Sequence, residues 1–248
     1  MFYVGADVSK GRWLAVKLSE GEPCEVRLFD TIRDIWNIYK AAQLILIDIP
    51  IGLREKGSQE RQCDKEARRL LKWPRCSSIF RAPCRGTLEY YADYPTAKEI
   101  NKLLTGGKSL SKQSFSIMPK IKEVDDFLQE DISARSTIRE IHPEVCFWAL
   151  NGGKPVMSKK KEADGFQERM TLLRNAYRQT GAVDAVIQHA KSKYPGMVAD
   201  DIADALVAAA TALLTRHKVL TLPEKPEVDE RGLPMEMVYY LMQAEKEG

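Results

Sequence analysis

Three aspartates of the chain stand among apolar neighbours. Asp7 lies in an alternating apolar segment, Asp48 follows the apolar run Leu44 to Ile47, and Asp204 is the only charged residue between Ile202 and Leu214. A buried carboxylate must lose its charge or find a cation. Carboxylates that lie close together repel each other unless a divalent cation lies among them. Because all-oxygen ligand sets select hard cations, the three aspartates predict a site for Mg²⁺ or Mn²⁺.

A fourth acid, Asp201, precedes Asp204 by one helical turn, so the two share a helix face. Asp7, Asp48 and Asp201 also have purely structural explanations. Asp48 would satisfy backbone N–H groups in a turn. Asp200 and Asp201 would serve as an N-cap and a first-turn acid that complements the helix dipole. Asp7 would pair with a basic residue. A shared site, by contrast, explains all of them together.

The string Glu140-Ile-His-Pro-Glu144 is the most unusual in the chain. At a strand end, Glu140 and His142 would share a face. We take Glu140, His142 and Glu144 as candidate catalytic residues that position water or substrate. The alternative is that His142 forms a hydrogen-bonded turn, with Glu144 serving the dipole of a helix that Pro143 opens.

Positive charge is concentrated in one part of the chain. The net charge is only +3, from 38 basic and 35 acidic residues. The segment Arg54 to Arg85 holds ten basic against four acidic residues, a net charge of +6. Such a stretch forms either a solvated helix face or a contact surface for a phosphate backbone. The candidate substrate-binding residues are Arg68, Arg69, Lys72, Arg75, Arg81 and Arg85, together with Lys120 and Lys160 outside the segment.

The elements that position these residues follow from periodicity. Strands are predicted at residues 2–9, 13–18, 25–29, 44–49 and 137–142. Short turns join the first three strands into an antiparallel meander, and the continuous apolar run of the fourth suits a central strand. Helices are predicted at residues 30–42, 111–130 with an interruption near Pro119, 167–179, 183–193 and 200–217, with a short helix opening at Pro143. This order predicts a mixed five-stranded α/β sheet flanked by helices.

The chain of 248 residues has room for a core domain with an inserted subdomain. We expect residues 1–53 and 136–219 to form the core. The polar segment 54–135 would be a mostly helical insertion between two core strands. The proline-containing segment 220–248 would be a C-terminal tail.

Several features point to the cytoplasm. The five cysteines show no Cys-x-x-Cys spacing, which favours a reducing compartment over a disulfide framework or a zinc site. The N-terminal segment lacks the basic region of a signal peptide. The apolar runs are too short to span a bilayer, so no membrane association is expected. The oligomeric state stays open.

At this point the chain resembles known proteins. Asp7 with the turn that follows it looks like the first hairpin of RNase H-like proteins, and Asp48 resembles the acid on their fourth strand. Asp201-Ile-Ala-Asp204-Ala-Leu resembles the Asp/His-x-x-Asp-Ala-Leu helix of the Holliday-junction resolvase branch. From about residue 1 to residue 240, the chain most closely resembles the predicted RNase H-like nuclease family, also called domain of unknown function 429. The matching segments are Ile47 to Gly52, Ser78 to Phe80, Pro119 to Ile121, Glu140 to Val145 and Asp200 to Ala205.

The resemblance implies an RNase H-like fold and a metal-dependent nuclease. Asp7 would bridge two metal ions, Asp48 would hold one of them, and Asp201 and Asp204 would hold the other. The expected partner is nucleic acid. Two alternatives remain: a non-nuclease enzyme that handles phosphate on the same fold, and a catalytically silent interaction module. The glycine-rich phosphate loops of actin-like sugar kinases are lacking, which disfavours a kinase.

Overall fold

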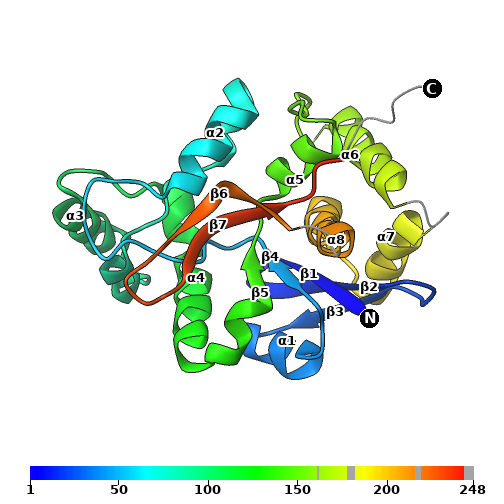
Figure 1. The fold of residues 1–248 in the computed structure, drawn as a ribbon, viewed down its shortest axis with the longest axis horizontal. Coiled ribbons are helices and arrows are strands. Elements are labelled where there is room, and N and C mark those ends of the chain that lie inside the picture. Colours follow the sequence, from blue (N-terminus) through cyan, green and yellow to red (C-terminus); the bar gives the residue numbers. More distant parts are fainter. Residues whose placement is uncertain (161, 178–181, 216–218, 243–248) are drawn as a thin grey trace.

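The computed structural model describes the chain except residues 161, 178–181, 216–218 and 243–248, so the ends of two predicted helices and of the predicted tail lie outside the described residues. Five strands form one mixed sheet in the order β3-β2-β1-β4-β5 (Figure 1). Strands β1 to β3 form an antiparallel meander, and β4 and β5 run parallel to β1. The predicted mixed α/β fold with a five-stranded sheet is confirmed. The strands are β1 (Phe2–Ser9), β2 (Arg12–Ser19), β3 (Glu25–Phe29), β4 (Ile45–Ile47) and β5 (Ile138–Glu140).

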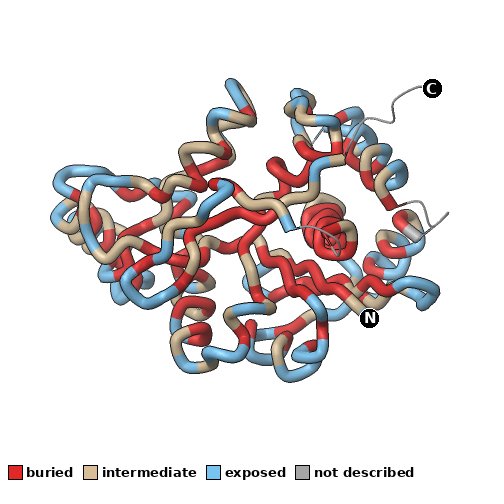
Figure 2. The backbone as a smooth tube through the Cα atoms, viewed as in Figure 1, coloured by how far each residue is buried: buried red, intermediate tan, exposed pale blue. Residues whose placement is uncertain are grey.

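Helices cover both faces of the sheet. One face packs against α5, α7 and α8 and the other against α1 and α4, and each interface forms its own apolar core. Figure 2 shows that the sheet and α8 are the most deeply buried parts of the molecule. The described helices are α1 (Ile32–Tyr39), α2 (Gln62–Arg75), α3 (Tyr94–Thr105), α4 (Lys112–Glu130), α5 (Pro143–Leu150), α6 (Ala163–Ala176), α7 (Ala182–Lys193) and α8 (Ala199–Leu214), with 3₁₀ turns η1 (Cys76–Ser78), η2 (Arg85–Tyr90) and η3 (Ile132–Ser136).

Helix α8 lies directly on β1. A Cβ atom at Gly5 would collide with backbone atoms of Ala205 and Ala209, so glycine is required for this approach. The face of α8 that meets the sheet is almost entirely alanine, which lets the two backbones come close. This contact holds the first turns of α8 beside the carboxyl end of β1.

The segment 54–135 supplies none of the five sheet strands. It nevertheless contributes to the core, because Ile121 and Val124 of α4 are buried against the sheet residues Val4 and Ile45. Helix α4 continues through Pro119, where the sequence predicted an interruption. The buried neighbours Met118 and Ile121 hold this part of the helix against the core and offset the backbone hydrogen bond that proline cannot make.

The predicted C-terminal tail is wrong for most of its length. Strands β6 (Leu220–Val228) and β7 (Pro234–Tyr239) pair antiparallel as a separate hairpin, which contacts α2 and β5 (red in Figure 1). Met235 and Val238 of β7 are fully buried. The prolines suggested irregular chain, but a hairpin outside the main sheet tolerates proline because no second neighbour needs its missing N–H.

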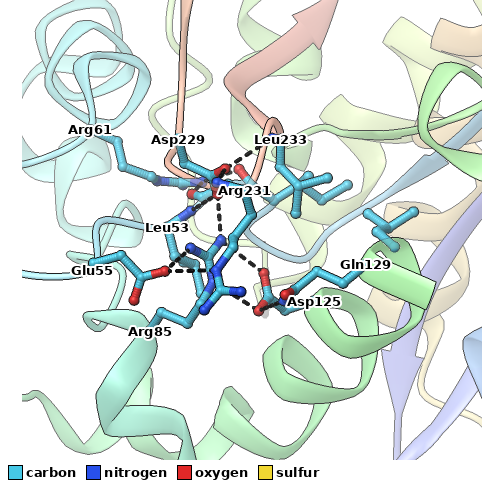
Figure 3. Close-up of polar contacts among 12 residues, drawn as sticks. Leu53, Glu55, Arg61, Arg85, Asp125, Gln129, Asp229, Arg231 and Leu233 are labelled. Carbon is cyan, nitrogen blue, oxygen red and sulfur yellow. Dashed lines mark hydrogen bonds and ion pairs between the residues drawn. The ribbon is translucent and has the colours of Figure 1, made fainter. Parts of the chain in front are cut away.

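Arg85 is not available to bind a substrate, contrary to its assignment from the sequence. Its guanidinium is buried and pairs with three carboxylates, those of Asp125, Glu55 and Asp229 (Figure 3). Asp229, in the β6–β7 turn, also accepts a hydrogen bond of 2.9 Å from the backbone N–H of Leu53. This network therefore fastens the hairpin to the segment 54–135.

Among the described residues, no helix is long and apolar enough to cross a membrane.

Candidate metal centre

The aspartates of β1, β4 and α8 meet at one edge of the sheet. Strands β1 and β4 are parallel neighbours, with Ala6 opposite Ile47, so Asp7 and Asp48 follow as the next residues on each strand. Both side chains lie on the face that α8 covers, because side chains alternate along a strand and Gly5 of β1 contacts that helix. Asp204 faces them from the second turn of α8.

Electrostatics at this edge favours the neutral acids. Burial, followed by the charges of Asp48 and Asp204, raises the pKa of Asp7 well above its usual value. Burial and the charge of Asp204 do the same to the pKa of Asp48. Burial raises the pKa of Asp204 to about 6. The three carboxylates repel each other where water is scarce, and a cation among them would relieve that repulsion.

A side-chain cation already lies at the cluster. Lys160 places its ammonium nitrogen 2.7 Å from Oδ2 of Asp204. The charges of Asp204, Asp7 and Asp48 all raise the pKa of Lys160, so the ammonium also interacts with the other two aspartates. Within the described ranges, no group of three or more Asp, Glu, His and Cys side chains stands close enough together to hold a metal ion as arranged. The donor set consists of carboxylate oxygens alone, which is the chemistry a hard cation requires. The residues therefore fit Mg²⁺ or Mn²⁺ by chemistry, provided that the Lys160 ammonium gives way.

Asp201 borders the cluster without being a helix cap. Helix α8 begins at Ala199, its N-cap residue is Val198, and no side chain caps it, so Asp200 and Asp201 both lie in the first turn. Oδ2 of Asp201 accepts a 2.5 Å hydrogen bond from the hydroxyl of Ser9 at the end of β1. This bond fixes the start of α8 to the strand that bears Asp7.

A cleft opens next to the carboxylates. Its inner part, about 190 Å³, is lined by Asp7 and Asp48 and by mostly apolar side chains. Its outer part, about 360 Å³, is lined by Asp204, Lys160 and Arg75. The two parts are continuous through shared lining residues, namely Asp48, Ser78, Phe80, Ile117 and His142. The cleft thus runs between the sheet edge and the segment 54–135.

His142 lines the cleft, but its ring nitrogens are engaged. It is the N-cap of α5, where Nδ1 accepts a 3.2 Å hydrogen bond from the backbone N–H of Glu144. We therefore assign the proton to Nε2, which faces the backbone of Ser78. Burial lowers the pKa of His142 to about 4, so the ring is neutral at pH 7. This arrangement matches the structural alternative, in which His142 holds a turn and positions Ser78 at the cleft.

Glu140 is held by a buried arginine rather than by the aspartate cluster. Its two carboxylate oxygens lie 2.7 and 2.9 Å from the guanidinium nitrogens of Arg61, which also pairs with Asp64 at 2.6 Å. Oε2 of Glu140 accepts a further 2.7 Å bond from the backbone N–H of Ile51. Glu140 therefore fixes the loop that follows Asp48.

Glu144 has a similar partner. Its carboxylate oxygens lie 2.7 and 2.9 Å from Nη2 of Arg169, which is fully buried in α6. Glu144 also lines the outer cleft. The pair joins α5 to α6 on the side of the cleft where Lys160 lies.

The remaining basic candidates fall into three groups. Arg75 and Lys160 line the cleft. Arg69 and Lys72 are exposed on α2. The others are engaged elsewhere: Arg68 with Glu60 and the carbonyl of Ile79, Arg81 with the carbonyl of Ser58, and Lys120 with Glu123 and the carbonyl of Asp30.

Sequence reasoning missed Arg61, Arg169 and Ser9 as residues that position the acids. Nothing in the local sequence distinguishes Arg61 and Arg169 from exposed helical arginines. Their full burial beside Glu140 and Glu144 arises from packing alone. Ser9 had a signal, since it lies on the same strand face as Asp7.

The family model described as "Protein of unknown function (DUF429)" matches residues 5–228 of the chain. No curated protein and no solved structure matches it significantly. The matched range includes β1 from Gly5 onward, the other four strands of the sheet, α8 and all four aspartates.

Proposed function

We propose that this chain, which belongs to the DUF429 family, is a metal-dependent phosphodiesterase with an RNase H-like fold that acts on nucleic acid. The observation that supports the proposal most is the meeting of Asp7, Asp48 and Asp204 at one sheet edge, where their shared burial raises the pKa of each. The charges of Asp7, Asp48 and Asp204 destabilise each other, and Lys160 offsets only part of that repulsion, so the cluster is suited to binding a further cation.

Asp7, Asp48 and Asp204 would hold Mg²⁺ or Mn²⁺, with Asp201 at the margin. The ion would lower the pKa of a bound water to give a nucleophile and would stabilise the leaving oxygen. Lys160 and Arg75 line the same cleft and offer positive charge to the phosphate. Neutral His142 supports the cleft wall through its bonds to Glu144 and the Ser78 backbone, and it does not act as a general base.

A second candidate function is a catalytically silent interaction module. The ion pair of Lys160 with Asp204 favours it, because that pair partly neutralises the cluster without metal. A calorimetric titration with Mn²⁺ distinguishes the phosphodiesterase from the silent module. A silent module should bind Mn²⁺ weakly and equally in the parent and in Asp48→Asn.

The direct test is hydrolysis of labelled DNA and RNA strands with Mg²⁺, Mn²⁺ or EDTA. We expect metal-dependent cleavage by the parent and a loss of at least about 100-fold in Asp7→Asn and Asp48→Asn, because each variant lacks a carboxylate that would hold the ion and its charge stabilisation. Cleavage that persists in EDTA, or in both variants, would contradict the proposal.

A further inference from the structure

Trp73, near the end of α2, is the most exposed large aromatic side chain in the described part of the protein. It is 78% exposed, whereas Trp13 is fully buried and Trp148 makes an edge-to-face contact with Tyr239. Within the described residues, no ring contact or cation–π contact involves Trp73. An indole left in water gives up the large gain from burying an aromatic ring.

The backbone presents Trp73 at an energetic cost. Lys72 has φ 55° and ψ 172°, and Trp73 itself is extended, so the chain leaves helical geometry at these two residues. A lysine at positive φ is strained, and such strain gathers at functional sites. Helix α2 projects from the body of the molecule, and its outer end is exposed (Figures 1 and 2).

Three basic residues without an ion-pair partner in the described structure lie within four residues of Trp73 in the chain. Over the described residues, Arg69, Lys72 and Arg75 form no ion pair with any carboxylate, whereas Arg68 in the same helix pairs with Glu60. The Nε atom of Arg75 is buried and has no hydrogen-bond partner. Charge and exposed aromatic surface therefore coincide at one place on α2.

This place adjoins the cleft. Arg75 lines the outer cleft together with Asp48, Asp204 and Lys160. Trp73 precedes Arg75 by two residues, so their Cα atoms are at most about 7 Å apart. A chain that contacts Trp73 therefore lies next to the residue that lines the cleft of the carboxylates.

We propose that the outer end of α2 is a docking platform for single-stranded nucleic acid, with one base stacked on Trp73 and the adjoining phosphates on Arg69, Lys72 and Arg75. The inference rests on the proposed function and names its substrate class. Aromatic rings next to unpaired cations bind single strands with little sequence preference, because every base has a stacking face. In a duplex these faces are covered by neighbouring base pairs, so the platform selects single strands.

The test is a binding titration of the full chain in EDTA, which separates it from catalysis. A single-stranded thymidine oligomer and a duplex of the same length serve as probes. Binding is measured by tryptophan fluorescence and by the anisotropy of a labelled strand. We expect the single strand to quench the fluorescence and to bind at least tenfold tighter than the duplex. Trp73→Ala should weaken single-strand binding by roughly tenfold. Trp148→Phe, the control, should retain both binding and quenching.

Trp73→Phe separates stacking from folding. It should keep most of the affinity measured by anisotropy, because phenylalanine also stacks, while losing the quenching signal. Equal affinity of Trp73→Ala and the parent, or equal binding of single strand and duplex, would overturn the inference. Metal-dependent cleavage with an unchanged KM in Trp73→Ala would also overturn it and would leave the proposed function standing.

Discussion

The Lys160 ammonium nitrogen lies 2.7 Å from Oδ2 of Asp204, and the two residues are 44 positions apart. Asp204 is buried, whereas the Lys160 side chain is 41% exposed. A partly exposed cation thus pairs with a buried carboxylate. Any divalent ion that binds Asp204 has to compete with it.

Lys160→Met removes that competitor. We expect a larger Mg²⁺-induced rise in melting temperature than in the parent, because the metal no longer displaces an ion pair. The metal-free variant should melt slightly lower, since a buried acid loses its counterion. Thermal melts over a Mg²⁺ series measure both effects. Lys159→Met is the matched control, because its pair with Glu162 is exposed, and it should behave like the parent. A parent and a Lys160→Met variant with identical Mg²⁺ responses would contradict the prediction.

Asp204→Asn keeps the shape of the side chain and removes its charge. We expect the metal-free variant to be as stable as the parent or more stable, because burial penalises the ionised acid and Lys160 can return to solvent. The Mg²⁺-induced shift should largely disappear. Asp184→Asn, which alters an exposed pair with Arg174, should keep the shift. A clearly lowered melting temperature in metal-free Asp204→Asn would instead indicate an ordinary structural acid.

The pKa of Asp204 also predicts a pH dependence. Folding raises this pKa from 3.8 to about 6, so the folded state binds more protons than the unfolded state between those values. The contribution of Asp204 to stability is therefore present below about pH 4 and is lost as pH rises through about 6. Between about pH 4 and pH 6, the free energy of unfolding of the metal-free parent should fall by at most about 3 kcal/mol relative to that of Asp204→Asn. Denaturant unfolding of both proteins at pH 4, 5, 6 and 7 measures the difference. A difference in unfolding free energy between the two proteins that does not change with pH would contradict the raised pKa of Asp204.

Arg85→Met tests the corrected role of Arg85. The change leaves the buried carboxylates of Asp125 and Asp229 without their cation, which costs about 3–5 kcal/mol. Arg75→Met removes a cation with no carboxylate partner in the described structure and should alter the free energy of unfolding by less than about 1 kcal/mol. Urea unfolding compares the two variants. Equal stability would show that the network does not hold the β6–β7 hairpin.

Charge reversal of Arg69 and Lys72 tests the basic face of α2. Glutamates at both positions should weaken binding to a polyanion and flatten the dependence of log K on log salt, because fewer counterions are released. The control reverses Arg33 and Arg174, which are exposed and paired with Glu130 and Asp184. Fluorescence anisotropy between 50 and 200 mM salt, roughly the range over which such contacts are lost, gives the slopes. An unchanged slope would make Arg69 and Lys72 part of a solvated face.

Local sequence patterns were enough to predict the sheet and the positions of the acids along it. Alternation in Phe2–Ser9 and the apolar run before Asp48 are local patterns, and local periodicity fixes which side chains face a core. The register of β1 beside β4 then brings Asp7 and Asp48 to one edge, as parallel neighbours must.

The cationic partners of the buried acids, by contrast, depend on contacts between distant segments. Arg61 pairs with Glu140 across 79 positions and Arg85 with Asp229 across 144, and no local pattern encodes such distances. The β6–β7 hairpin was missed for the same reason, because it packs against α2 and β5, which lie far from it in the chain. Burial and pairing of charge depend on how distant segments fold together, whereas strand and helix formation depends on near neighbours in the chain.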